Sequence, residues 1–113
     1  GWLCQSGYEW GQHVLIGLKS GLSEEDIEDI KTGPEAERWS SHDRLLLRAV
    51  DELNADAFLS DDVWLGLKGS YSEPQMMDLV FTVGQYQLVS MALNTFGVQL
   101  DPGLPAMSQP PTQ

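Results

Sequence analysis

The stretch MMDLVFTVGQYQLVSMALN, residues 76–94, restricts the possible folds of this chain more than any other. Its apolar side chains recur at helical spacing and cover most of the circumference of a helix. A membrane span is the rival interpretation. Polar side chains within the stretch make burial in lipid costly, and basic flanks are absent. We therefore expect a helix that neighbouring helices bury on several sides.

This helix is predicted over residues 73–96. Ser72 is a suitable N-cap, Pro74 is tolerated in a first turn, and Gly97 is a common residue just past a helix end. Four shorter helices are predicted upstream. The first covers residues 2–19, and the second covers residues 24–31 and follows the capping-box pattern SEED. The third is capped by Ser40 or Ser41 and is expected to fray near residues 54–57, and the fourth covers residues 61–69 after Ser60. Phe58 and Leu59 are expected to anchor the loop before the fourth. No strand-like alternation of useful length occurs, so the predicted class is all-α.

Chain length limits how this fold is organised. At 113 residues the chain makes one domain, which we place at residues 1–101. Residues 102–113, PGLPAMSQPPTQ, contain four prolines and are expected to form an extended Pro-rich tail that is ordered only where it lies on a neighbour. So small a domain cannot surround its longest helix. Part of that helix is therefore expected to face another copy of the chain in a homo-oligomer.

Composition excludes several classes of partner. Six Lys and Arg stand against 17 Asp and Glu, giving a net charge of −11. An acidic surface of this kind repels nucleic-acid phosphates and anionic membranes, so neither partner is expected. With Cys4 as its one cysteine the chain forms no intrachain disulfide, and no signal peptide is recognisable at its start, which favours the cytoplasm. The first residues lack an initiator Met and read as helix interior, so more residues are expected upstream in the natural protein.

The segment YEWGQH, residues 8–13, holds the best candidate for chemistry. Glu9 and His13 are four positions apart, so both side chains lie on one helical face, and Ser6 joins that face one turn earlier. A carboxylate beside an imidazole fixes its tautomer and favours its charged form, which gives a proton-transfer centre near neutral pH. The alternative is an ordinary helix pair that contributes a few tenths of a kcal/mol, roughly, to stability.

Other polar and aromatic residues are candidates for secondary roles. Ser6, Trp10, Gln85 and Tyr86 are candidate substrate-binding residues, with core packing or bonding between helices as their alternative role. His42 is expected to serve a helix cap or an oligomer contact. Arg44 and Arg48 share a face and are expected to pair with Asp51, Glu52 or a neighbouring subunit, or to bind a substrate carboxylate.

A metal site is not expected. Glu9 and His13 supply two ligands at most, with His42 and Asp43 as remote additions, whereas a catalytic zinc site needs about three protein ligands. We predict neither a metal nor another cofactor.

Three blocks together resemble one family. They are YEWGQH (residues 8–13), SSHDRLLLRAVDEL (residues 40–53) and MDLVFTVGQYQLVSMALN (residues 77–94), in an order and spacing that extend over residues 2–101. The chain thereby resembles carboxymuconolactone decarboxylase-like proteins of the alkylhydroperoxidase D-like superfamily. The resemblance implies an all-helical fold and assembly as trimers or hexamers. It also implies one of two activities: decarboxylation of 4-carboxymuconolactone in aromatic catabolism, or thiol-based peroxide reduction.

The chain departs from the redox branch at sulfur. That branch carries a Cys-x-x-Cys pair followed by a His four residues after the second Cys. With His13 set on that His, Ser6 and Glu9 occupy the two cysteine positions, and Cys4 lies outside the register. A disulfide cycle needs an attacking thiolate and a resolving thiol, so thiol peroxidase is the disfavoured function.

The sequence thus predicts a cofactor-free lyase that resembles carboxymuconolactone decarboxylase. Its substrate would be a small carboxylated lactone or a related enolisable acid, with His13 and Glu9 transferring the proton. The alternative function is a non-catalytic or small-ligand-binding family member.

Overall fold

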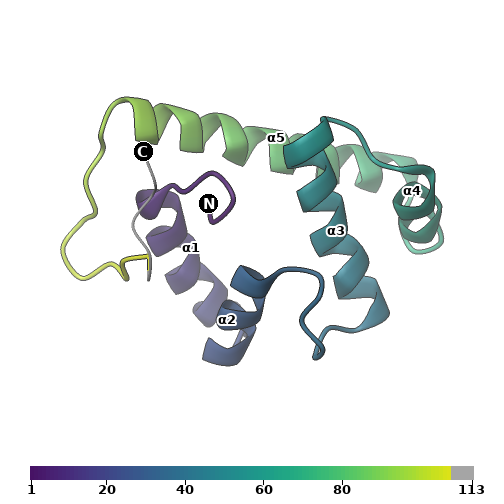
Figure 1. The fold of residues 1–113 in the computed structure, drawn as a ribbon, viewed down its shortest axis with the longest axis horizontal. Helices are drawn as coiled ribbons and strands as arrows, with labels where there is room; N and C mark the ends of the chain where they lie inside the picture. The colour runs from purple at the N-terminus through teal and green to yellow at the C-terminus, as the bar shows by residue number, and fades with distance from the viewer. Residues whose placement is uncertain (108–113) are drawn as a thin grey trace. The chain divides into compact units, whose positions relative to one another are not determined.

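A computed structural model describes residues 1–107 as five α-helices, with no β-strand among them (Figure 1). The helices are α1 (Gly7–Lys19), α2 (Glu24–Thr32), α3 (Ser41–Asp56), α4 (Asp61–Lys68) and α5 (Glu73–Thr95). This confirms the all-α class, whereas the family-level fold stays a prediction. Residues 108–113, the last part of the predicted Pro-rich tail, lie outside the described residues.

The chain divides into two compact units. One combines Gly1–Glu28 with the chain from Tyr86 onward, and the other is Asp29–Gln85. The helices α2 and α5 each pass from one unit into the other, and each unit is described by itself below. The predicted division at residue 101 stays a prediction.

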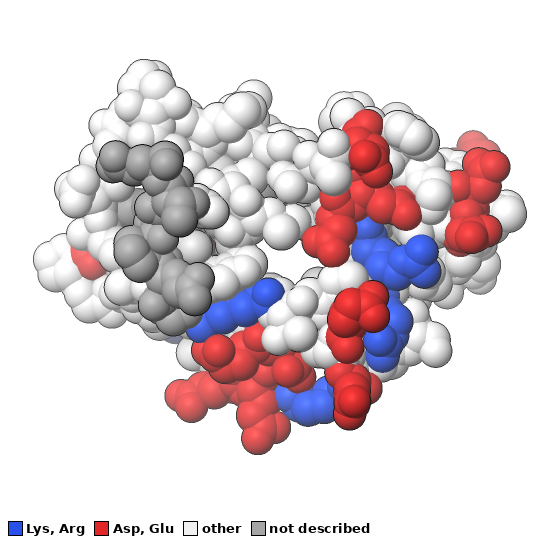
Figure 2. All heavy atoms as spheres, in the orientation of Figure 1, with Lys and Arg blue, Asp and Glu red and all other residues white. Residues whose placement is uncertain are grey.

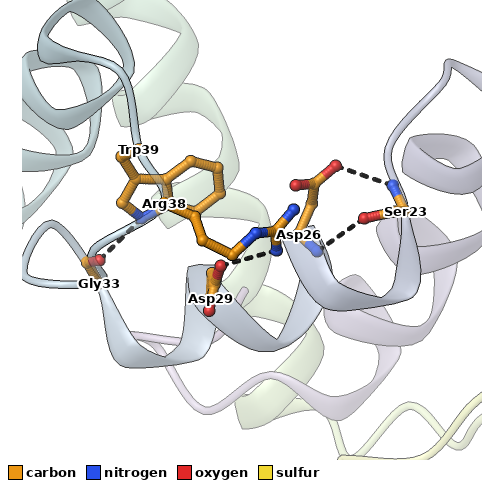
Figure 3. Close-up of polar contacts among 6 residues, drawn as sticks. All are labelled: Ser23, Asp26, Asp29, Gly33, Arg38 and Trp39. Atoms are coloured by element: carbon orange, nitrogen blue, oxygen red, sulfur yellow. Dashed lines mark hydrogen bonds and ion pairs between the residues drawn. The ribbon is translucent and has the colours of Figure 1, made fainter.

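Serine side chains fix the beginnings of four helices, as the sequence predicts, and the structure decides between the two candidates for α3. Before α2, the Asp26 amide donates to Ser23 Oγ at 3.0 Å and the Ser23 amide donates to Asp26 Oδ2 at 2.8 Å, a complete capping box (Figure 3). Ser40, rather than Ser41, caps α3 by accepting from the Asp43 amide at 3.1 Å. At the starts of α4 and α5, Ser60 and Ser72 accept from backbone amides of their first turns.

Helix ends differ from the prediction mainly at the start of α1. Residues 2–5 form a turn and α1 begins at Gly7, because Gln5 has a left-handed φ of 52° and Ser6 is extended. The predicted helix over residues 2–19 is therefore wrong over its first five residues. Helix α3 ends at Asp56, inside the range of residues 54–57 where its end was predicted, and it stops where Ala57 turns left-handed with φ of 63°. The remaining ends agree with the prediction to within one residue.

A loop over residues 33–40 is held within the second unit by polar contacts. Arg38 Nη1 lies 2.9 Å from Asp29 Oδ2, and Trp39 Nε1 donates to the Gly33 carbonyl at 3.0 Å (Figure 3). The guanidinium of Arg44 donates to the carbonyls of Pro34, at 2.9 Å, and Trp39, at 3.4 Å. Arg44 thus serves the backbone of this loop rather than Asp51 or Glu52, while its pairing with a neighbouring subunit or a substrate carboxylate stays a prediction.

The core of the second unit lies where α3, α4 and the start of α5 meet. Ala49, Val63, Leu67 and Met76 are buried there, and five partly buried side chains pack around them: Leu45, Leu46, Leu59, Tyr71 and Leu79. Leu59 thus anchors its loop as predicted. Phe58 does not, because 67% of it is exposed.

Replacing Leu67 by Ala is expected to lower the free energy of unfolding by about 2–5 kcal/mol, because a fully buried side chain leaves a cavity. Leu65→Ala on the same helix is the matched control, since Leu65 is 69% exposed. It should change the free energy by less than about 0.5 kcal/mol. Urea denaturation of both variants measures the difference, and equal losses would contradict this assignment of the core.

Glu52 of α3 joins that helix to the beginning of α4. Its carboxylate accepts from the Ser60 amide at 2.8 Å and from the Ser60 hydroxyl at 2.7 Å. These hydrogen bonds, with the charge of Arg48 nearby, lower the pKa of Glu52 from its ordinary value of 4.5. The neighbouring carboxyl of Asp51 behaves oppositely, because partial burial raises its pKa.

The lowered pKa of Glu52 and the raised pKa of Asp51 change the stability of the fold at neutral pH in opposite directions. A lowered pKa means that Glu52 stabilises the fold above pH 4.5 and loses this contribution as the pH falls through the folded-state pKa. Glu52→Gln should therefore be less stable than the wild type at pH 7 and approach it in acid. Asp51→Asn should be more stable at pH 7, since it removes the cost of a partly buried charge. Urea midpoints at pH 7 and at about pH 3 measure both effects. A pH-independent difference for Glu52→Gln would contradict the assignment.

The long helix α5 is apolar on two faces, but only one is covered. Met76 and Ser90 are buried on the inner face. On another face, large apolar side chains are exposed along the helix: Met77, Val80, Phe81, Leu88 and Met91. The expectation of burial on several sides is therefore wrong for the single chain. The expectation that part of the helix stays uncovered is confirmed.

The first unit packs the end of the chain against α1. Trp10 and Val14 are buried on one side of the helix, with the ring of Trp10 centred 5.1 Å from that of Trp2. A Cβ added at Gly11 would lie 2.6 Å from the Pro105 carbonyl oxygen and 3.0 Å from Leu100. The described part of the predicted tail thus lies directly on α1, at a position where only glycine leaves room.

Candidate functional site

The first turns of α1 bring Glu9 and His13 together. His13 Nδ1 lies 2.7 Å from Glu9 Oε2 and 3.0 Å from the Glu9 carbonyl oxygen. Both neighbours of Nδ1 are acceptors, so Nδ1 carries a hydrogen and the neutral ring has its lone pair on Nε2. The predicted pair therefore exists, with a defined tautomer.

The pair is buried unequally. The side chain of Glu9 is 10% exposed and that of His13 is 42% exposed. The carboxylate is thus held inside while the imidazole reaches solvent. This is the arrangement in which an acid orients a ring that exchanges protons with an outside molecule.

The aromatic ring of Tyr86, on α5, lies beside the imidazole of His13. Its ring meets that of His13 edge-on, with centroids 4.8 Å apart and planes at 81°. Of the predicted substrate-binding residues, Tyr86 is the one whose ring contacts the imidazole.

The other three predicted substrate-binding residues lie in different surroundings. Ser6 is fully buried at the N-cap of α1, but its hydroxyl makes no capping bond. Trp10 packs in the core against Trp2. Gln85 is exposed and lies about 100° around α5 from Tyr86. Binding of substrate by these residues stays a prediction.

Ser90 was not among the predicted site residues. It is fully buried on α5, one helical turn after Tyr86, and its hydroxyl has no hydrogen-bond partner among residues 1–107. One turn further on, Asn94 Nδ2 donates to the Cys4 carbonyl at 2.9 Å. The sequence signal was the spacing 86, 90, 94, which places three polar side chains on one face of an otherwise apolar helix.

Two tyrosine hydroxyls form hydrogen bonds that do not involve Glu9 or His13. Tyr8 donates to Asp101 Oδ2 at 3.0 Å, and Gln12 Nε2 donates to the Tyr8 hydroxyl at 3.2 Å. In the second unit, His42 Nε2 lies 2.8 Å from the Tyr71 hydroxyl. His42 therefore links the start of α3 to the segment before α5, and an oligomer contact stays a prediction.

Across residues 1–107, no three His, Cys, Asp or Glu side chains converge in a way that could hold a metal ion. In the same part of the chain, no helix combines the length and apolarity needed to cross a bilayer.

Comparisons with protein-family models, with curated proteins and with solved structures give no match for this chain.

Proposed function

We propose that this protein is a cofactor-free lyase of the carboxymuconolactone decarboxylase type. Its substrate is a small carboxylated lactone or a related enolisable acid, of the kind that arises in aromatic catabolism. The observation that carries the proposal is the 2.7 Å contact between a buried Glu9 carboxylate and a partly exposed His13 ring. Two of the three sequence blocks that resemble the family, residues 40–53 and 77–94, support it independently of that contact.

The pair suits the proton step of a decarboxylation. As the substrate carboxylate leaves as CO₂, the electron pair of the broken C–C bond passes into the adjoining carbonyl system and forms an enolate. Protonated His13 then delivers the Nε2 proton to carbon, and the carboxylate of Glu9 stabilises the imidazolium beforehand. Because 42% of the His13 side chain is exposed, solvent can restore the proton.

Two other functions are separable from this one. A small-ligand-binding protein would bind a lactone acid without forming product. A thiol peroxidase is disfavoured, since the chain has one cysteine and the proposed centre contains none. The single cysteine supports the cytoplasmic location that we propose.

We also propose that copies of this chain associate through the exposed apolar face of α5. Residues 79–95 contain no Asp, Glu, Lys or Arg, and the surface over the C-terminal part of α5 is uncharged in Figure 2, whereas acidic side chains gather over α2. A second copy brings a face of the same uncharged character, so the negative charges elsewhere need not oppose each other at close range. The trimer or hexamer of the resembled family is the expected assembly.

His13→Ala is expected to reduce the kcat for 4-carboxymuconolactone by about 100-fold or more, because it removes the proton donor. Glu9→Gln should reduce kcat less, since the ring remains without its charged partner. Loss of substrate absorbance and CO₂ release measure turnover, and circular dichroism monitors helicity.

The second histidine offers the control for this experiment. His42→Ala removes an imidazole that bonds to Tyr71 and should leave kcat within about twofold. Unchanged turnover in His13→Ala would overturn the lyase proposal. Saturable binding by the wild type without product would favour the ligand-binding function.

Phe81→Glu or Leu88→Glu should shift the protein toward monomer, because each places a charge in the exposed apolar face of α5. Leu65→Glu is the matched control, since it adds the same charge at an equally exposed leucine of α4. Light scattering coupled to size-exclusion chromatography gives the masses. A wild-type monomer, or equal behaviour of all three variants, would contradict this assignment.

A further inference from the structure

The exposed side of α5 carries a regular spacing that its apolar character alone does not require. Exposed residues recur there at alternating intervals of four and three positions, and we call them the outer stripe: Met77, Phe81, Gly84, Leu88, Met91 and Thr95. This is the spacing of the a and d positions of a heptad repeat, with a period of about 3.5 residues. Residues at this spacing form one narrow line along a helix. In coiled coils such a line packs against a second helix.

Gly84 lies in the middle of the outer stripe without a reason inside its own chain. A Cβ added there would meet no heavy atom within 4 Å outside its own helix, and Gly84 is not among the glycines with a positive φ. Neither crowding nor a left-handed backbone therefore requires glycine. In a helix interior glycine is less favourable than alanine. Close approach of a second helix is a use of glycine that fits an exposed position in an apolar line.

Charge selects a second copy of the chain as the occupant of the outer stripe. Residues 79–95 contain no charged side chain, although the whole chain has a net charge of −11. A second copy presents the same uncharged line. Pairing about a two-fold axis covers both lines at once, because each is the other's partner. The four large apolar side chains of the stripe, each more than half exposed in the single chain, are then removed from water together.

Charge and side-chain size also decide the direction of pairing. In a parallel pair, Glu73 of one copy comes beside Asp78 of the other, because these are the g and e positions that flank the stripe. The two copies of Gly84 would also meet at one level and leave a gap. In an antiparallel pair centred at the level of residue 86, Asp78 faces the uncharged end of the partner helix. Each Gly84 then faces a leucine.

We propose that the α5 helices of two copies pair antiparallel along the outer stripe, with Leu88 of each copy packing over the partner subunit's Gly84. Phe81 then meets the partner subunit's Met91, and Met77 meets the partner subunit's Thr95. This rests on the proposed association through α5 and is independent of the lyase reaction. Because the contact is two-fold, an assembly built on it contains an even number of copies, such as a dimer or a hexamer of three pairs.

Cysteine crosslinking distinguishes the two directions. Met77→Cys and Thr95→Cys are made as separate proteins in a Cys4→Ser background, which removes the natural thiol. In the antiparallel pair the two copies of residue 77 are about 27 Å apart along the helix axis, too far for a disulfide. Each protein alone should give no crosslinked dimer on mild oxidation, whereas an equimolar mixture should. The same mixture oxidised in urea is the control for random crosslinking.

Gly84→Ala should have opposite effects on the single chain and on the pair. In the monomeric Phe81→Glu background it should raise Tm by roughly 4–8 °C, because alanine is the better helix former and its methyl group has open space. In the otherwise wild-type protein, the added methyl groups occupy the space of the leucines, so the Kd of the pair should rise at least about 10-fold. Thr82→Ala, on α5 but outside the outer stripe, should leave that Kd unchanged. Sedimentation equilibrium measures the Kd.

The outcomes separate this inference from the proposals on which it rests. A monomeric wild type overturns both the association through α5 and this inference, and leaves the lyase proposal untouched. If the wild type associates, but either single-cysteine protein crosslinks to itself or the mixture does not crosslink, the association stands and antiparallel pairing is overturned. An unchanged Kd in Gly84→Ala overturns the packing of Leu88 over Gly84.

Discussion

The burial of the Glu9 carboxylate beside His13 is the constraint on which the candidate site depends. A charged group placed inside a small helical unit must be compensated, and the imidazole at 2.7 Å supplies the compensation. The same contact fixes Nδ1 as the donating nitrogen and leaves Nε2 for an outside molecule. Local stability and the proton transfer that we propose therefore have the same origin, namely two side chains one helical turn apart.

Packing between α1 and the C-terminal half of α5 gives this pair its surroundings. The rings of His13 and Tyr86 meet edge-on, and the side-chain amide of Asn94 donates a hydrogen bond to the Cys4 carbonyl oxygen. Ser6 and Ser90 are also buried in this unit, and neither hydroxyl has a hydrogen-bond partner within residues 1–107, which costs stability.

Local patterns predicted the local structure well. The cap residues Ser23, Ser60 and Ser72 and the pair in YEWGQH were recognisable because each depends on residues at most four positions apart. The turn at residues 2–5 was missed, since the left-handed Gln5 belongs to a residue type that gives no such signal.

Contacts distant in sequence were beyond prediction from pattern alone. Ser90 reads from the sequence as an ordinary polar residue of a long helix, and the pattern does not reveal that the fold buries it. Several carboxylates near Arg44 in the sequence were candidate partners, yet in the folded loop Arg44 donates to the carbonyls of Pro34 and Trp39.

The close approach of Pro105 to Gly11 has a consequence for how the pair is presented. Gly11 lies between Glu9 and His13 in sequence, on a side of α1 where the returning chain leaves no space for a methyl group. The Tyr8–Asp101 bond fastens the same returning chain one residue before Glu9. These contacts come from residues that follow α1 by some ninety positions in the sequence, and they restrict rotation of α1 about its own axis. Changes near the end of the chain would therefore be transmitted to the direction in which the imidazole points.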